Sequence, residues 1–124
     1  MSHLEPFPVR TTVNELLRLQ ELELILAESR IIHASASHPP TAIRQIEADI
    51  ASLRAGIPMA HLRRYDRLRR SGLGVAQEEG GVCTACHLSV NQGDLIRMRR
   101  GEMAWTCPHC ARFLLLTPAN ADSP

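Results

Sequence analysis

Four cysteines stand in two close pairs in the last third of the chain. Two residues separate Cys83 from Cys86 and Cys107 from Cys110, and twenty residues lie between the pairs. This spacing is typical of four-cysteine zinc sites. Two short turns that each present two thiolates can surround one ion tetrahedrally, and four protein ligands leave no position for water. The sequence therefore predicts one structural Zn²⁺ ion bound by Cys83, Cys86, Cys107 and Cys110.

The same four cysteines are compatible with three other roles: an iron site, a haem attachment site and a disulfide framework. Four thiolates can also hold a single iron ion. The segment from Cys83 to His87 matches the attachment pattern of a c-type haem, but that role leaves the second pair unexplained. A disulfide framework needs an oxidising compartment, whereas the N-terminal residues lack the apolar stretch of a signal peptide, so we expect a cytoplasmic protein with reduced thiols. His87 and His109 adjoin the cysteines, and we expect both outside a shell that four thiolates complete.

Short elements must hold the two cysteine pairs in place. The pattern predicts a helix over 92–99 that Gly101 ends, and strands over 102–106 and 111–116, with another strand opening at Val75. Trp105 and Phe113 are the expected small apolar core. Glu78 and Glu79 fall on an expected loop, where we predict them to be solvated. Because such a ribbon buries little surface, metal binding should supply much of its folding free energy, about 10–16 kcal/mol in zinc-finger peptides.

A long helix is expected near the N-terminus. Thr12 and Glu15 form a capping box, and the helix should run from there to about His33. Alternating spacings of four and three predict a packing seam, and a second apolar row lies beside it. Two neighbours within the chain, or one neighbour and a dimer partner, would account for both rows. The seam comprises Val13, Leu17, Gln20, Leu24, Ala27 and Ile31, and the second row comprises Leu19, Leu22 and Leu26.

Two further helices are predicted before the ribbon. After a turn at Pro39 and Pro40, Thr41 is expected to cap a helix that Gly56 ends, and the short loop favours antiparallel packing on the first helix. Pro58 suits the start of a third helix that ends near Gly72, although the segment could instead continue the second helix beyond a kink. The expected buried stripes are Ile43, Ile46, Ile50 and Leu53 in the second helix, and Met59, Leu62, Tyr65 and Leu68 in the third.

Together these elements predict a mainly α fold with a small β part. A short antiparallel helical hairpin and a third helix precede a C-terminal four-cysteine zinc ribbon. The expected divisions are an irregular lead-in over 1–11, a helical hairpin or coiled-coil region over 12–71, the ribbon over 72–117 and a disordered tail over 118–124. The sequence has no apolar run of about eighteen residues, so we expect no membrane span.

Five segments carry a resemblance to a known family: 16–21 (LLRLQE), 57–69, 81–88 (GVCTACHL), 99–101 (RRG) and 107–114 (CPHCARFL). They resemble bacterial proteins with an N-terminal coiled-coil hairpin and a C-terminal four-cysteine zinc ribbon, described as candidate nucleic-acid-binding proteins. The resemblance implies zinc at the four cysteines and a regulatory or adaptor role, since some members are linked to flagellar or secretion-system gene expression. Two departures stand out: the hairpin is much shorter than in the family, and Ala111 replaces a frequent glycine.

The arginines are the second candidate for chemistry. The whole chain has a net charge of +1 and a pI of about 7.8, well below a dedicated nucleic-acid-binding domain. Residues 57–71, however, hold five arginines against Asp66, which gives +4. Besides phosphate binding, a solvated helix face or contact with an acidic protein surface would also explain this charge. The candidate phosphate-binding residues are Arg63, Arg64, Arg67, Arg70, Arg97, Arg99 and Arg100.

Two functions remain open at this stage. The leading hypothesis is a zinc-ribbon adaptor that binds the backbone phosphates of RNA or DNA through the arginines, with binding that weakens steeply with salt. The alternative is a protein–protein adaptor or a homodimer formed through the helices, with a purely structural ribbon. We do not expect an enzyme, because the sequence has no phosphate-cradling glycine loop, no nucleophile paired with a base and no open metal position.

Overall fold

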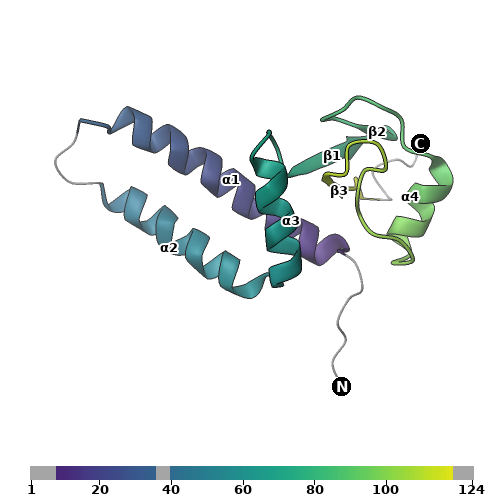
Figure 1. Cartoon of the computed structure of the whole chain (residues 1–124), viewed down its shortest axis with the longest axis horizontal. Coiled ribbons are helices and arrows are strands. Elements are labelled where there is room, and N and C mark those ends of the chain that lie inside the picture. The colour runs from purple at the N-terminus through teal and green to yellow at the C-terminus, as the bar shows by residue number, and fades with distance from the viewer. Residues whose placement is uncertain (1–7, 36–39, 119–124) are drawn as a thin grey trace, which may run out of the picture.

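The computed structural model describes residues 8–35 and 40–118. Helices α1 and α2 lie side by side as an antiparallel hairpin, α3 stands between this hairpin and the sheet, and α4 lies at the far end of the ribbon (Figure 1). This arrangement confirms the predicted fold class of helices followed by a small β part. The helices are α1 (Arg10–Ile32), α2 (Thr41–Gly56), α3 (Met59–Arg69) and α4 (Gln92–Arg99), and the strands are β1 (Val75–Glu79), β2 (Val82–Cys83) and β3 (Phe113–Leu115).

Some predicted boundaries fall outside the described residues. These include most of the lead-in over 1–11 and, apart from Pro118, the whole predicted tail over 118–124. Among the described helices, none has an apolar stretch long enough to cross a membrane.

The predicted capping residues are wrong for both helices of the hairpin. Helix α1 begins at Arg10, and Val9 occupies its N-cap without a side-chain hydrogen bond. Thr12 is therefore inside the helix, where it is buried. The chain enters α1 early because the Pro8 carbonyl accepts a hydrogen bond from the Trp105 amide (2.8 Å), which fixes the residues just before the helix. Thr41 is likewise the first residue of α2 and makes no capping bond, because Pro40 takes the N-cap position.

The predicted seam of α1 is correct only in its first half. Val13 and Gln20 are buried, whereas Leu24 is exposed and Ile31 is 78% exposed. The second predicted row, Leu19, Leu22 and Leu26, is the one that stays buried along the helix. Helix α1 packs against α2 on one side and against β1 and β3 on another, so two neighbours within the chain cover its buried residues, whereas the distal residues of the first row stay exposed.

Helices α2 and α3 are separate helices rather than one kinked helix. Ile57 between them has an extended backbone (φ −95°, ψ 135°), and Pro58 takes the N-cap of α3. Leu62 and Tyr65 are the buried residues of α3, whereas Met59, which was expected in its stripe, is exposed.

A polar network ties the three helices together. Arg54 of α2 donates to both carboxylate oxygens of Asp66 in α3, at 3.2 and 2.6 Å. The Tyr65 hydroxyl donates to the Glu23 carboxylate of α1 at 2.6 Å. Burial raises the pKa of Tyr65, and the bond to Glu23 raises it further, so the phenol stays protonated and keeps donating. This network fixes the angle at which α3 leaves the hairpin.

The sheet has the order β2-β1-β3. Strands β1 and β2 form an antiparallel hairpin around Gly80 and Gly81, and both glycines have positive φ (60° and 82°), as a tight two-residue hairpin turn requires. Strands β1 and β3 are parallel, with Val75 paired to Phe113. Helix α4 occupies the predicted residues, and Gly101 follows its C-cap with φ 74°.

The strand predicted over 102–106 is absent, and only an isolated bridge joins Thr106 to Phe113. The strand predicted over 111–116 is reduced to β3, because Ala111 has a left-handed backbone (φ 66°) that no extended strand accommodates.

Glu78 lies in β1 and is only 2% exposed, so the prediction of a solvated loop residue is wrong. Its carboxylate accepts hydrogen bonds from the Thr117 amide and hydroxyl, both at 2.9 Å, and from the Gly81 amide at 2.8 Å. Burial acts to raise the pKa of Glu78, but these bonds and the charge of Arg99 outweigh it and hold the pKa below its ordinary value. Glu79, the next residue, is exposed as expected.

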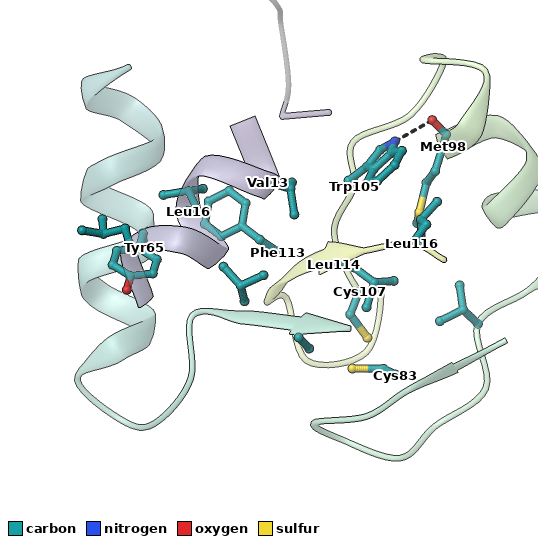
Figure 2. Close-up of a cluster of buried hydrophobic side chains, with 14 of the residues drawn as sticks. Val13, Leu16, Tyr65, Cys83, Met98, Trp105, Cys107, Phe113, Leu114 and Leu116 are labelled. Carbon is teal, nitrogen blue, oxygen red and sulfur yellow. Dashed lines mark hydrogen bonds between the residues drawn. The ribbon is translucent and has the colours of Figure 1, made fainter. Parts of the chain in front are cut away.

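One apolar core extends from the helices into the ribbon. Figure 2 shows Phe113 of β3 beside Val13 and Leu16 of α1, with Tyr65 of α3 nearby. Trp105 closes the other end of this core, and its indole N–H donates to the Met98 carbonyl at 2.6 Å. The predicted packing role of Trp105 and Phe113 is therefore confirmed, but their contacts are not confined to the ribbon.

Buried hydrogen bonds join α1 to the start of β1. The Gln20 side-chain carbonyl accepts from the Gly74 and Val75 amides at 2.8 and 2.9 Å, and its amide donates to the Val75 carbonyl at 3.1 Å. Gly74 also lies so close to Tyr65 that a Cβ there would stand 2.7 Å from the ring. The junction between α3 and the ribbon is thus fixed against the helices.

Candidate metal centre

The two cysteine pairs lie on two turns with the same backbone pattern. In the first turn, the His87 amide donates to the Cys83 carbonyl at 2.8 Å. In the second, the Ala111 amide donates to the Cys107 carbonyl at 2.9 Å. The Cys83 amide donates to the Leu88 carbonyl, and the Cys107 amide donates to the Arg112 carbonyl. In both turns the acceptor lies five residues after the cysteine. Each turn therefore closes on itself and aims two sulfur atoms in one direction.

Each turn needs a left-handed residue directly after its second cysteine. His87 has φ 64° and Ala111 has φ 66°, and they are the non-glycine residues with positive φ in the described part of the chain. A side chain in this region costs about 1–2 kcal/mol. This explains physically why glycine suits the position of Ala111.

The four sulfur atoms form one compact group. All lie within 4.8 Å of one another, and the Sγ–Sγ distances of Cys83–Cys110 and Cys86–Cys107 are both 3.8 Å. A tetrahedron with metal–sulfur bonds of about 2.3 Å has edges of about 3.8 Å. A disulfide would need about 2.05 Å, and all four cysteines are free thiols. The predicted four-cysteine group is therefore present and can hold a metal ion.

These thiols differ in their burial and in the direction of their pKa shifts. Cys83 and Cys107 are buried at the edge of the apolar core, where Figure 2 shows their sulfur atoms facing each other. Burial raises the pKa of both thiols, that of Cys107 to about 12. Burial also acts on Cys110, but hydrogen bonds from Arg112 and the neighbouring thiols outweigh it and lower its pKa to about 7. Metal binding to such a group releases protons.

Neither neighbouring histidine belongs to the group. His87 and His109 are both exposed, and the His109 Nε2 lies 2.9 Å from the Ser89 carbonyl oxygen. The group of possible metal ligands in the described residues contains the four cysteines alone.

The four candidate arginines of α3 and its C-cap divide into two kinds. Arg63, Arg67 and Arg70 are exposed. Arg64 instead faces the ribbon: its guanidinium lies 4.2 Å from the centre of the Phe113 ring and donates to the Ala111 carbonyl. Burial lowers the pKa of Arg64, and so does the charge of Arg67. Arg64 therefore links α3 to the second cysteine turn rather than pointing into solvent.

The three predicted arginines near α4 also differ. Arg97 forms an ion pair with Asp94 at 2.7 Å. Arg99 lies 3.5 Å from the Glu78 carboxylate and donates to the Thr117 carbonyl at 3.3 Å. Arg100 is exposed. Three of the seven predicted arginines, Arg64, Arg97 and Arg99, thus support the fold or pair with an acid.

Sequence reasoning missed the roles of Gln20 and Glu78. The repeat pattern places Gln20 in an apolar seam, and its bonding partners lie more than fifty residues away, where no local pattern shows them. Glu78 had a usable signal, because Gly80-Gly81 is a typical two-residue hairpin turn that places the preceding residues in a strand.

Comparisons with known proteins address the fold alone. No protein-family model matches the chain, and no curated protein matches it. Among solved structures, the chain is similar to CT398 from Chlamydia trachomatis, with a TM-score of 0.52 and 22% identity. The similarity covers 61% of this chain and 33% of CT398, so the chain spans about a third of that protein's length.

Proposed function

We propose that this chain is a structural zinc protein whose α3 arginines bind nucleic-acid phosphates. Support for zinc comes from the donor set: four thiolates with tetrahedral spacing suit Zn²⁺, whereas hard cations such as Mg²⁺ and Ca²⁺ take oxygen ligands. Iron is the competing ion for this set. Four protein ligands leave no open position, so we assign the ion a structural role and propose no enzymatic activity. Reduced thiols fit a cytoplasmic setting.

Family membership is part of the same proposal. A helical hairpin before a four-cysteine ribbon is the arrangement that the sequence resemblance implies for the bacterial zinc-ribbon hairpin family. The short hairpin separates this chain from the long-armed members. An adaptor role through the arginine surface would not depend on long arms.

The exposed face of α3 carries the nucleic-acid proposal. Arg63, Arg67 and Arg70 follow one another at spacings of four and three, which puts them on one face of the helix. All three are exposed, and none forms an ion pair within the described residues. Asp66, the acidic residue of this helix, already forms an ion pair with Arg54. Guanidinium groups arranged in this way can bind successive phosphates without reading bases.

A charge-matched pair of variants tests this proposal. Arg63→Gln with Arg67→Gln removes two charges from the α3 face, and Arg18→Gln with Arg44→Gln removes two exposed charges from the hairpin. Metal-loaded proteins are titrated with fluorescent single-stranded RNA and duplex DNA over a range of salt concentrations. The α3 variant should bind at least about tenfold more weakly, with a logarithmic salt slope smaller by about two. Equal binding by both variants would exclude α3 as the phosphate-binding surface.

Metal content is measured on the same preparations. One Zn²⁺ per chain is expected by elemental analysis after purification without added metal. Iron at the same stoichiometry would change the identity of the ion but not its structural role.

A second candidate function is pairing of two copies through α1. Leu24, Ile25, Ile31 and Ile32 are all exposed toward the end of this helix, whereas soluble monomers seldom gather apolar residues on one surface. Light scattering should then give the mass of a dimer for the wild type and of a monomer for Ile32→Asp. A monomeric wild type at all accessible concentrations would exclude this candidate, and a partner helix from another protein would then be the alternative occupant of this surface.

A further inference from the structure

A shallow pocket of about 310 Å³ lies between the start of α1 and the end of α4. Arg10, Arg99 and Arg100 all line it, and its remaining lining is apolar or glycine, without a carboxylate. Its volume is at the lower end of the range for small-molecule sites, about 300–1,000 Å³. These arginines come from segments about ninety residues apart, so folding alone brings them together.

Two of the three arginines are held in place. The guanidinium of Arg10 lies over the Trp105 ring, 5.4 Å from its centre. Trp105 is itself fixed, because its indole donates to the Met98 carbonyl and its amide to the Pro8 carbonyl, at 2.6 and 2.8 Å. Arg99 is anchored on Glu78 and Thr117. A site with fixed donors loses little side-chain entropy when a ligand binds.

Arg100 completes the pocket from the end of α4. It is the C-cap residue of this helix, and Gly101 turns the chain immediately afterwards. The Gly101 amide donates to the Met98 carbonyl and the Glu102 amide to the Arg97 carbonyl, at 3.0 and 2.9 Å, so the backbone that carries Arg100 is fixed. The side chain is exposed and borders the pocket.

We infer that this pocket binds a phosphate group. Three arginines line it and the charge of Arg99 is balanced by Glu78, so the positive charges of Arg10 and Arg100 remain for a ligand. Guanidinium forks match phosphate oxygens in geometry and charge. Trp105 is only 2% exposed and lies under Arg10, so no base can stack on it, and the ligand is recognised by its phosphate. A nucleic-acid backbone is one source of that phosphate, and to that extent the inference rests on the proposed function; a free phosphate ester is the other.

The single tryptophan of the chain reports on this pocket directly. The metal-loaded protein is titrated with inorganic pyrophosphate at constant ionic strength, and Trp105 fluorescence is recorded. A saturable change is expected, because a ligand that engages Arg10 alters the contact on the indole. Arg100→Gln should weaken this binding about tenfold or more, since it removes a charged hydrogen bond. Arg97→Gln is the matched control: it removes the same charge from the same helix, but from a residue paired with Asp94 outside the pocket, and should leave the affinity unchanged.

The absence of a saturable response, or equal affinities of the Arg100 and Arg97 variants for pyrophosphate, would refute phosphate binding by this pocket. The same two variants are then titrated with single-stranded RNA to identify the source of the phosphate. Weaker RNA binding by Arg100→Gln alone assigns the pocket to the nucleic-acid backbone, whereas unchanged RNA binding beside weakened pyrophosphate binding assigns it to a free phosphate ester. If the wild type binds pyrophosphate but no nucleic acid, the proposed function is refuted, whereas phosphate binding by the pocket is supported.

Discussion

At the scale of single residues, the candidate metal centre depends on backbone conformation as much as on its sulfur atoms. Each cysteine turn closes through an amide of a residue with left-handed backbone, His87 or Ala111. Neither residue type favours that region, although histidine enters it more readily than alanine. The second turn therefore carries a local conformational cost that a glycine at position 111 would avoid.

Replacing Ala111 with glycine should make the metal-loaded protein more stable. The change removes the energetic penalty of a side chain at φ 66°. Glycine also has more freedom in the unfolded chain, which offsets part of this gain, so the free energy of unfolding should rise by about 1 kcal/mol. Urea unfolding of the metal-loaded protein measures this increase. Ala85→Gly in the first turn, whose φ is not positive, is the control and should be neutral or destabilising. A destabilising Ala111→Gly would show that relief of backbone strain is smaller than the entropy that glycine adds to the unfolded chain.

At the scale of elements, α1 shows how a helix can change its buried face along its length. Its first half joins the core that includes the strands, and five of its seven buried residues fall between Thr12 and Gln20. Its second half meets α2, which leaves Ile31 and Ile32 exposed. A single repeat pattern predicts one continuous seam, so it found the helix and its hairpin partner but misplaced the distal contacts. The role of Gln20 was missed for the same reason: position in a repeat does not reveal a polar partner in another element.

Gln20 should contribute strongly to the attachment of α1 to the sheet. Gln20→Leu keeps the size of the side chain but leaves the buried Gly74 and Val75 amides and the Val75 carbonyl without this partner. Each unsatisfied group costs about 1–3 kcal/mol, so we expect a loss of about 3 kcal/mol or more. Chemical denaturation measures the loss, and Gln45→Leu, at an exposed site of α2, should change stability little. Similar values for the two variants would contradict the assigned role.

At the scale of the whole molecule, helices and ribbon share one core. Phe113 and Leu114 of β3 belong to the same buried cluster as Val13, Leu16 and Tyr65. The sequence could predict the four-cysteine group, because each pair lies in one short turn, and the helices, because their apolar residues recur locally. It could not predict this shared core, since the parallel pairing of β1 with β3 and the contacts of Phe113 with α1 join segments far apart in the chain.

Removal of the metal should therefore affect the helices as well as the ribbon. As a chelator withdraws the ion, Trp105 fluorescence and part of the helical circular dichroism should change together, because α3 and the first half of α1 pack on residues that the cysteine turns hold in place. Cys107→Ser should reproduce the effect, and added Zn²⁺ should reverse it in the wild type alone. A fluorescence change with a constant helical signal would instead indicate a ribbon that unfolds independently.

The close approach of Gly74 to Tyr65 sets a condition on evolutionary change. Any β-carbon at position 74 would collide with the aromatic ring, so a larger residue there demands a smaller one at position 65. In an alignment of chains that share this architecture, these two columns should accordingly vary together, as compensating substitutions between α3 and the start of the sheet.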